Sequence, residues 1–280
     1  MNNPNGDRLN WREGKEKLIV PITSKTRIGL LTDMDGTISP IVKRPDLAQV
    51  SDASRRLLSE LYQVITLVAV ISGRAVSEVV EKVNLPHLVY VGNHGLERWE
   101  NNAIKVDQAQ VVAAARPHLD VVKRLITPQL QEGIWIEDKI TTLTIHYRES
   151  LSPEASAAYL GPLVQKIAVE QGLLFSNGKM SFEIKPDINI DKGTIVRQLV
   201  SEYHLDAAIY LGDDTSDIDA MLALRDIRHE GKCLTVGIGV ESSEMPDKLR
   251  ANVDLLATNV ADVEAFLGWF LSEIFSKKHD

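Results

Sequence analysis

The sequence has little cysteine and no long apolar run. Cys233 is the single cysteine among 280 residues, so an intrachain disulfide is excluded and a reducing, cytoplasmic setting is expected. No apolar stretch reaches the length of a membrane span, and the first residues lack the apolar segment of a signal peptide. We therefore expect a soluble protein with no membrane partner, in which Cys233 packs within a buried strand rather than reacts.

An excess of positive charge is also missing. The net charge is −8 and the basic residues are dispersed, whereas nucleic-acid binders usually carry a clustered basic face, so no nucleic-acid partner is expected. Internal repeats and low-complexity tracts are absent as well. A chain of this length can bury a large core, and it favours one main domain with a smaller second one.

A pair of carboxylates following a short apolar run is the most informative feature that the sequence contains. Residues 28–32 lack helical periodicity and predict a central parallel strand, and Asp33 and Asp35 follow it directly. Gly36 allows the chain to turn so that both carboxylates surround one point, where they could hold Mg²⁺ together with a phosphate. Taken alone, the motif also fits a common Asp-Gly turn.

A second apolar run, residues 65–71, ends in Ser72 and Gly73. A serine at a strand end can donate a hydrogen bond to a phosphate oxygen. Ser72 also precedes a helical pattern at 75–80, where it could act as an N-cap. The two interpretations are compatible, because helix N-termini attract anions.

Two later motifs carry a lysine and a group of acids. Lys192 opens a predicted helix and offers a positive charge for phosphate, although a lysine at a helix start is usually solvated and opposes the helix dipole. The predicted strand at 207–212 runs into four acidic residues between 213 and 219, which repel one another unless a cation or hydrogen-bond donors offset them. Some of these acids are expected to cap the next helix at 218–224.

The order of these four motifs resembles the haloacid dehalogenase superfamily of phosphatases. Strand and helix patterns alternate over 28–92, which predicts a doubly wound, Rossmann-like α/β core with a parallel sheet. From about residue 107 the pattern changes to a helix at 111–126, paired strands at 134–147, a helix at 153–170 and strands near 173 and 182. This segment predicts an inserted α+β cap domain.

The expected domains follow from these patterns. Residues 27–106 and 186–280 are predicted to form the phosphatase core, and residues 107–185 the cap. Residues 1–26 are polar and predict a partly mobile amino-terminal extension, which Trp11 could dock to the core.

The middle of the chain is similar to the trehalose-6-phosphate phosphatase family in segments 91–97, 133–148 and 178–186. The resemblance implies a Mg²⁺-dependent hydrolysis of trehalose 6-phosphate in trehalose biosynthesis, through an aspartyl-phosphate. It implies a small-molecule sugar phosphate as substrate, and any trehalose-phosphate synthase would be a separate chain. A monomer is expected.

The resemblance assigns roles to the core motifs. It implies that Asp33 is the nucleophile and that Asp35 is the general acid and base. The metal would be held by Asp33, Asp213 and the backbone carbonyl of Asp35. The remaining core residues would bind phosphate (Gly36, Ser72, Gly73 and Lys192) or support these groups (Asp214 and Asp217).

The resemblance also implies a set of sugar-binding residues: Glu137, Lys139, Arg148, Glu183, Arg74, Asn93 and His94. Charged groups suit the recognition of hydroxyls, because burying them unpaired would be costly. Glu137 and Lys139 lie two residues apart and share a face if they lie on a strand, although a solvated ion pair explains that spacing too. His94 could simply bond to the backbone beside Gly95.

The chain departs from the family pattern at Ile218, which replaces an acid and leaves the exact substrate open. Three alternatives stay open. The first is a phosphatase of another glycosyl phosphate, such as sucrose phosphate, glucosylglycerol phosphate or a glycosyl phosphoglycerate. The second is a sugar phosphomutase, which would have to protect its phosphoenzyme from water. The third is a catalytically silent sugar-phosphate sensor, disfavoured by the presence of Asp33, Asp35, Lys192 and Asp213.

Overall fold

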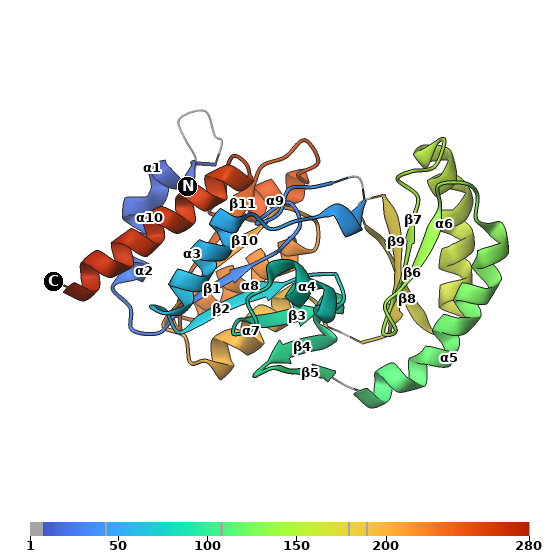
Figure 1. Cartoon of the computed structure of the whole chain (residues 1–280), viewed down its shortest axis with the longest axis horizontal. Coiled ribbons are helices and arrows are strands. Elements are labelled where there is room, and N and C mark those ends of the chain that lie inside the picture. The colour runs from blue at the N-terminus through green and yellow to red at the C-terminus, as the bar shows by residue number, and fades with distance from the viewer. Residues whose placement is uncertain (1–7, 43, 107–108, 179, 189, 280) are drawn as a thin grey trace. The chain divides into compact units, whose positions relative to one another are not determined.

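The computed structural model describes residues 8–42, 44–106, 109–178, 180–188 and 190–279. The chain forms two compact units. One comprises Met1–Lys105 and Ile190–Asp280, and the other Val106–Asn189. Figure 1 labels most of the helices and strands of both units.

The first unit is built on an eight-stranded sheet with the order β12-β11-β10-β1-β2-β3-β4-β5. The strands from β12 to β3 pair in parallel, and β4 pairs with β3 in the antiparallel sense. The doubly wound parallel core predicted from the sequence is thereby confirmed. The strands are β1 (Ile28–Thr32), β2 (Leu67–Ile71), β3 (Val89–Gly92), β4 (Glu97–Glu100), β5 (Ala103–Val106), β10 (Ala207–Gly212), β11 (Leu234–Val240) and β12 (Leu255–Ala257).

Helices cover both faces of this sheet. Neighbouring strand residues Leu30 and Leu31 belong to two different apolar clusters, as expected when successive side chains point to opposite faces. One cluster contains residues of α1, α3, α4 and α10, and the other contains residues of α7, α8 and α9. The helices are α1 (Trp11–Leu18), α2 (Val20–Thr23), α3 (Asp52–Tyr62), α4 (Val76–Val83), α7 (Lys192–Glu202), α8 (Asp217–His229), α9 (Asp247–Asn252) and α10 (Val260–His279).

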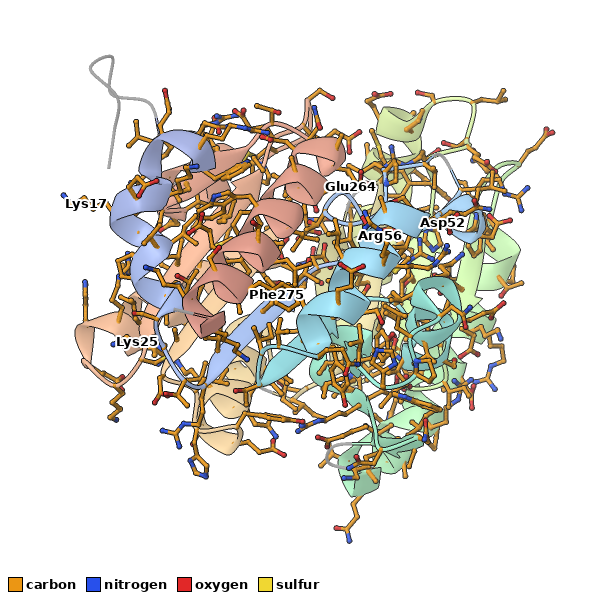
Figure 2. All side chains as sticks on the ribbon, turned by 60° about the vertical axis from the view of Figure 1, so that its left-hand side comes forward. Lys17, Lys25, Asp52, Arg56, Glu264 and Phe275 are labelled. Atoms are coloured by element: carbon orange, nitrogen blue, oxygen red, sulfur yellow. The ribbon has the colours of Figure 1, made fainter. Side chains whose placement is uncertain are left out.

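Polar contacts fix where these helices begin. Ser51 caps α3 by accepting a hydrogen bond from the Ser54 amide, and both serine hydroxyls donate to Glu264 of α10. Figure 2 labels Glu264 on α10 and Asp52 at the start of α3. Asp191 caps α7 through the amide of Thr194, at 2.7 Å. Two short 3₁₀ helices, Pro45–Leu47 and Asn93–Gly95, lie in connecting segments.

The segment before β1 is packed against the core. Trp11 is only 3% exposed and docks this segment, as the sequence predicts. Its indole nitrogen donates to Asp262 at the start of α10, at 3.1 Å. The amide of Leu256 in β12 donates to the carbonyl of Leu9, so the chain before α1 covers the outer edge of β12.

The second unit is an α+β structure with the sheet order β6-β7-β9-β8. All its neighbouring strands are antiparallel, and one face packs on α5 and α6. The predicted helix at 153–170 is confirmed by α6, which has these bounds. The elements are α5 (Ala109–Ile126), a 3₁₀ helix (Thr127–Gln129), β6 (Trp135–Asp138), β7 (Leu143–His146), α6 (Pro153–Glu170), β8 (Leu173–Gly178) and β9 (Ser181–Pro186).

Two expectations concern the single cysteine and the lack of a membrane-spanning segment. Cys233 lies immediately before β11 and is 5% exposed, and burial raises the pKa of its thiol to about 11. It therefore packs, as predicted, and is a poor nucleophile. Among the helices of the described residues, none is both long and apolar enough to cross a membrane.

Candidate active site

The predicted phosphate motifs follow the carboxyl ends of neighbouring parallel strands. Asp33 follows β1, Ser72 follows β2 and Asp213 follows β10, and these strands adjoin one another in the order β10-β1-β2. The amide of Asp33 donates to the carbonyl of Leu211 at 2.8 Å, which fixes the start of the loop after β1 against β10. Ligands of open α/β sheets bind at this edge.

The loop after β1 requires glycine at position 36. Gly36 has φ +84°, a conformation that residues with a side chain rarely adopt. A Cβ atom built there would lie 2.1 Å from Oδ2 of Asp213. The amide of Gly36 donates to the carbonyl of Ser39 at 2.7 Å, which closes the turn. The turn thus brings the backbone after Asp35 directly against the carboxylate of Asp213.

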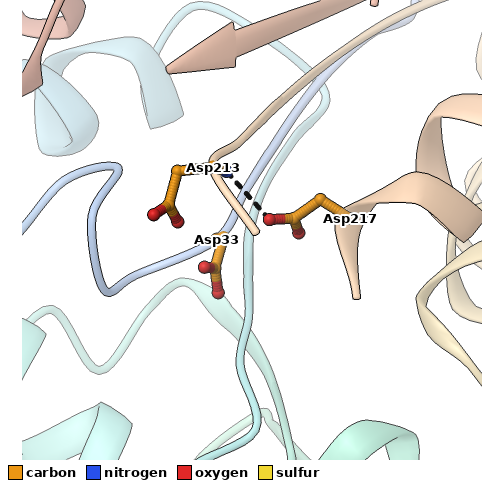
Figure 3. Close-up of side chains that lie close together, drawn as sticks. All are labelled: Asp33, Asp213 and Asp217. Carbon is orange, nitrogen blue, oxygen red and sulfur yellow. Dashed lines mark hydrogen bonds between the residues drawn. The ribbon is translucent and has the colours of Figure 1, made fainter. Parts of the chain in front are cut away.

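Three buried carboxylates converge at the strand ends, as Figure 3 shows for Asp33, Asp213 and Asp217. One oxygen from each lies within 4.8 Å of the others, and none of the three residues is more than 5% exposed. Nζ of Lys192 lies 3.1 Å from Oδ1 of Asp33 and 2.6 Å from Oδ1 of Asp217. The lysine at the start of α7 is therefore buried within the acidic cluster rather than solvated.

Asp217 accepts four hydrogen bonds from neighbouring groups of the protein. Its Oδ1 accepts from Lys192 and from the hydroxyl of Tyr210, both at 2.6 Å. Its Oδ2 accepts from the backbone amides of Asp213 and Asp214, both at 2.9 Å. A carboxylate offers about four acceptor positions, so the two oxygens of Asp217 are committed to protein donors. Asp33 and Asp213 complete the group of three carboxylates whose oxygens lie close enough together to ligate one ion.

Burial and charge shift the titration of the cluster. Burial raises the pKa of Asp33 well above its ordinary value, although Lys192 acts in the opposite direction. Burial by itself lowers the pKa of Lys192, but Asp217 and Asp33 outweigh it and hold that pKa well above its ordinary value. Lys192 therefore stays protonated, and one ammonium group faces several carboxylates.

This donor set fits a hard divalent cation. The three buried carboxyl groups outnumber the single ammonium group in contact with them, so a bound cation would offset their mutual repulsion and favour their ionised forms. Mg²⁺ prefers oxygen ligands and is usually held by one or two carboxylates.

Asp35 points its carboxylate to a different partner. Its two oxygens accept from Nε and Nη2 of Arg74, at 2.6 and 2.9 Å. Arg74 is 8% exposed and also pairs with Glu78. These two acidic partners outweigh the effect of burial and raise the pKa of the guanidinium well above its ordinary value. Arg74, predicted from the sequence to contact sugar, thus holds Asp35 in a bidentate contact.

The side chains of Ser72 and Asn93 help to hold the turn after β2 and the start of α4. The sequence predicts a phosphate contact for Ser72 and a sugar contact for Asn93. Oγ of Ser72 accepts from the amide of Arg74 at 3.2 Å, with Gly73 in the same bend. Asn93 is fully buried, and its side chain donates to Glu97 at 2.7 Å. The other oxygen of Glu97 accepts from the amide of Val76 at the start of α4, at 3.0 Å. The side chain of His94 lies outside the described residues.

Asp214 caps the turn before α8. Its Oδ1 accepts from the amide and hydroxyl of Ser216, at 2.8 and 2.7 Å. The carboxylate that contacts Lys192 at 2.6 Å is that of Asp217.

Two of the predicted sugar-binding residues of the second unit, Glu137 and Glu183, lie on one face of its sheet. Glu137 in β6 pairs with Thr144 in β7, which pairs with Glu183 in β9, so both glutamates lie in one row. Nζ of Lys139 lies 3.7 Å from Oε2 of Glu137. Arg148 follows β7 and is half-buried.

Sequence reasoning missed Tyr210. The residue lies in the otherwise apolar strand β10 and is fully buried. Because a buried hydroxyl needs a hydrogen-bond partner, this tyrosine was a usable signal for a polar contact near Asp213.

The parallel core, the strand-end acids and the inserted α+β unit define a protein of the haloacid dehalogenase fold. A solved trehalose-6-phosphate phosphatase C-terminal domain from C. albicans shares this fold, with a TM-score of 0.76, 22% identity, and coverage of 91% of this chain and 97% of that one. The sequence profile of the trehalose-phosphatase family matches residues 31–253. The chain therefore belongs to the trehalose-phosphatase family.

Curated relatives agree with this assignment. A trehalose 6-phosphate phosphatase of Zea mays is 28% identical over 260 residues, covering 86% of this chain and 69% of that protein. A trehalose-phosphate phosphatase of Mycobacterium marinum is 31% identical over 205 residues, covering 71% of this chain and 52% of the relative. The match thus spans about half the length of the mycobacterial protein.

Proposed function

We propose that this protein is a Mg²⁺-dependent phosphatase that hydrolyses trehalose 6-phosphate to trehalose and inorganic phosphate through an aspartyl-phosphate. Family membership and the names of the curated relatives support the substrate. One observation carries the chemistry: the buried carboxylate of Asp33 lies 3.1 Å from Lys192 within the acidic cluster at the strand ends.

In the first step, an oxygen of Asp33 attacks phosphorus and the bond from phosphorus to the sugar oxygen breaks. Asp35 donates the proton that the departing sugar oxygen requires. In the structure both oxygens of Asp35 accept from Arg74, so Asp35 has to leave this contact and take up a proton before it can donate to the leaving oxygen. The products are trehalose and an acyl phosphate on Asp33. Splitting one difficult displacement into two easier ones is the advantage of this route.

In the second step, Asp35 takes a proton from a water molecule whose oxygen attacks phosphorus. The bond between phosphorus and the Asp33 oxygen breaks, which releases phosphate and restores the Asp33 carboxylate. Asp35 thereby regains the proton that it donates in the first step of the next cycle, and the bidentate contact with Arg74 suits its ionised form between the two steps.

Asp33, Asp213 and the backbone carbonyl of Asp35 would hold the Mg²⁺ ion. When bound, the ion supplies positive charge that offsets the phosphate and lets an anionic nucleophile approach it. Lys192 would bind a phosphate oxygen from its fixed place between Asp33 and Asp217. Ser72, Gly36 and Gly73 would contribute the remaining phosphate contacts, with Asp214 and Asp217 holding the loop after β10.

The second unit would recognise the sugar. Glu137, Lys139, Arg148 and Glu183 offer charged donors and acceptors for hydroxyl groups, and two of them share a row of the sheet. We assign Arg74 and Asn93 to positioning, because both hold other protein groups in the structure. The role of His94 in sugar binding stays a prediction.

We place the reaction in the cytoplasm and propose that a monomer carries it out. A separate trehalose-phosphate synthase would supply the trehalose 6-phosphate. The fold is shared with a C. albicans trehalose synthase regulatory protein domain, at a TM-score of 0.67 and 13% identity. The nucleophile, proton donor, lysine and metal acid proposed here favour an enzyme over a catalytically silent sugar-phosphate sensor.

Phosphate release across a panel of sugar phosphates, with and without Mg²⁺, tests this proposal. We expect trehalose 6-phosphate to be hydrolysed far faster than sucrose 6-phosphate, glucosylglycerol phosphate and glucose 6-phosphate, and only with the metal. A preference for another glycosyl phosphate would keep the chemistry and replace the substrate. Conversion of glucose 1-phosphate to glucose 6-phosphate without phosphate release would indicate a mutase instead.

A further inference from the structure

The sheet of the second unit has one apolar and one polar face. Ile136, Ile145 and Phe182 form a row across β6, β7 and β9, and all three contact the apolar core of this unit. The row one residue earlier in β6 consists of Trp135, His146 and Ser181. Because side chains alternate along a strand, this second row points to the opposite face. A tryptophan is therefore placed on the polar face of the sheet.

Trp135 is held in a defined orientation on that face. Its ring stacks on that of His146, with centroids 4.1 Å apart and planes 19° apart. Nε2 of His146 in turn lies 2.8 Å from Oε2 of Glu137. The histidine is thus fixed between an aromatic ring and a carboxylate. Trp135 nevertheless remains 39% exposed, so its indole is both oriented and accessible.

Charged groups suited to hydroxyls lie on the same face of the sheet or beside it. Glu137 lies two residues along β6 on the same face, and Lys139 lies 3.7 Å from its carboxylate with only 8% of the lysine side chain exposed. Glu183 lies in the same row as Glu137. A pyranose has hydroxyls around its rim and C–H groups on its faces, so an aromatic ring beside carboxylates and an ammonium group matches both kinds of surface.

From this juxtaposition we infer that Trp135 stacks on a pyranose ring of the substrate and is a specificity-determining residue for glycosyl phosphates. His146 holds the indole, and Glu137, Lys139 and Glu183 bind hydroxyls around it. The inference rests on the proposed sugar-phosphate phosphatase function and adds a residue to it. The substrate class it defines is a phosphate monoester whose alcohol carries a pyranose ring.

A purely structural role for the Trp135–His146 pair makes a different prediction. Cross-strand aromatic pairs stabilise sheets, so loss of the indole would then lower stability and affect all substrates alike. Loss of a stacking platform would instead raise KM for sugar phosphates only, because small esters without a sugar never use it.

The test compares Trp135→Ala, Trp135→Leu and Trp135→Phe with the unchanged protein. Each is assayed with the best glycosyl phosphate of the panel and with p-nitrophenyl phosphate, and each is melted by calorimetry. Tyr159→Ala is the matched control, because Tyr159 is an exposed aromatic residue on α6 of the same unit, 53% accessible. Trp135→Leu keeps apolar bulk in case the alanine variant folds poorly.

We expect Trp135→Ala and Trp135→Leu to raise KM for the glycosyl phosphate about 10-fold, with kcat changed less than about 2-fold. Their kcat/KM for p-nitrophenyl phosphate should stay unchanged, Trp135→Phe should recover most of the loss, and Tyr159→Ala should match the unchanged protein. Equal losses on both substrates, or no change in KM, would overturn the role of Trp135. Failure of the unchanged protein to release phosphate from any glycosyl phosphate would instead refute the proposed function.

Discussion

The hydroxyl of Tyr210 donates a 2.6 Å hydrogen bond to Oδ1 of Asp217, the same oxygen that contacts Nζ of Lys192. Burial raises the pKa of Tyr210 well above its ordinary value, so the hydroxyl keeps its proton and acts as a donor. Tyr210 therefore helps to hold the carboxylate that positions Lys192 beside Asp33.

We predict that Tyr210→Phe reduces kcat about 10-fold, because a hydrogen bond to a charged group contributes about 1.5–3 kcal/mol and part of it positions Lys192. Tyr90→Phe is the control: Tyr90 is also fully buried, and its hydroxyl donates to the carbonyl of Leu85 at 2.7 Å. Both variants should lose stability in urea titrations. Unchanged turnover in Tyr210→Phe, or equal losses in both variants, would contradict the positioning role.

Asp33→Asn should abolish phosphate release while the fold is retained. The amide is close in shape to the carboxylate but cannot form the acyl phosphate, so we expect kcat to fall by at least ~10³-fold. Circular dichroism and the melting temperature report the fold. The control is Asp226→Asn, whose side chain is 48% exposed and pairs with Arg197. Near-normal turnover in Asp33→Asn would exclude it as the nucleophile.

Gly36→Ala should remove activity by displacing the carboxylate of Asp213. The new Cβ would lie 2.1 Å from Oδ2 of Asp213, and the positive φ adds a strain of about 1–2 kcal/mol. Gly231→Ala separates the two effects, because Gly231 has φ +70° but no atom within 4 Å of a built Cβ. We expect both variants to melt lower and only Gly36→Ala to lose turnover. Full activity in Gly36→Ala would argue against the close approach.

Mg²⁺ should stabilise the folded protein through Asp213. We expect the melting temperature to rise by about 2 °C or more when Mg²⁺ replaces a chelator, because the ion binds only the folded state. Asp213→Asn should melt at or above the unchanged protein in chelator, since it removes a buried like charge, but should not respond to Mg²⁺. Asp226→Asn should respond normally. A full response in Asp213→Asn would place the ion elsewhere.

Asp262 should make stability depend on acid pH. Burial opposes ionisation, but hydrogen bonds from Thr258, Arg12 and Trp11 outweigh it and lower the pKa of Asp262 from 3.8 to about 2. Because the pKa is lower in the folded state, the ionised carboxylate stabilises the folded protein above about pH 4. This contribution to the unfolding free energy is lost as the pH falls toward 2. Asp262→Asn should therefore lower the unfolding free energy by roughly 1–2 kcal/mol at pH 7.

Urea titrations at pH 7 and near pH 2 measure this contribution. The gap between Asp262→Asn and the unchanged protein should narrow at the lower pH, as the carboxyl becomes protonated. Glu16→Gln, an exposed change on the adjoining helix α1, should show no gap at either pH. A gap of the same size at both pH values would mean that the Asp262 charge contributes nothing.

Short sequence patterns were enough to predict a site residue wherever that residue directly follows an apolar strand. The apolar runs before Asp33 and Asp213 set both strands, and parallel pairing then brought their ends together. The partner of Asp35 could not be predicted in this way, because Arg74 lies 39 residues away and its contact depends on how the loops after β1 and β2 face each other. The same holds for Asp217, whose four donors come from three segments.

The parallel pairing of β1 with β10, which joins Ile28 to Ala207, also sets an order of assembly. All of Val106–Asn189 is made before β10 leaves the ribosome, and that contiguous segment has its own apolar core. During synthesis it can therefore fold while β1 still lacks one neighbour. Asp33 reaches its final surroundings only when the last third of the chain arrives, so a nascent chain cannot carry a finished phosphatase site.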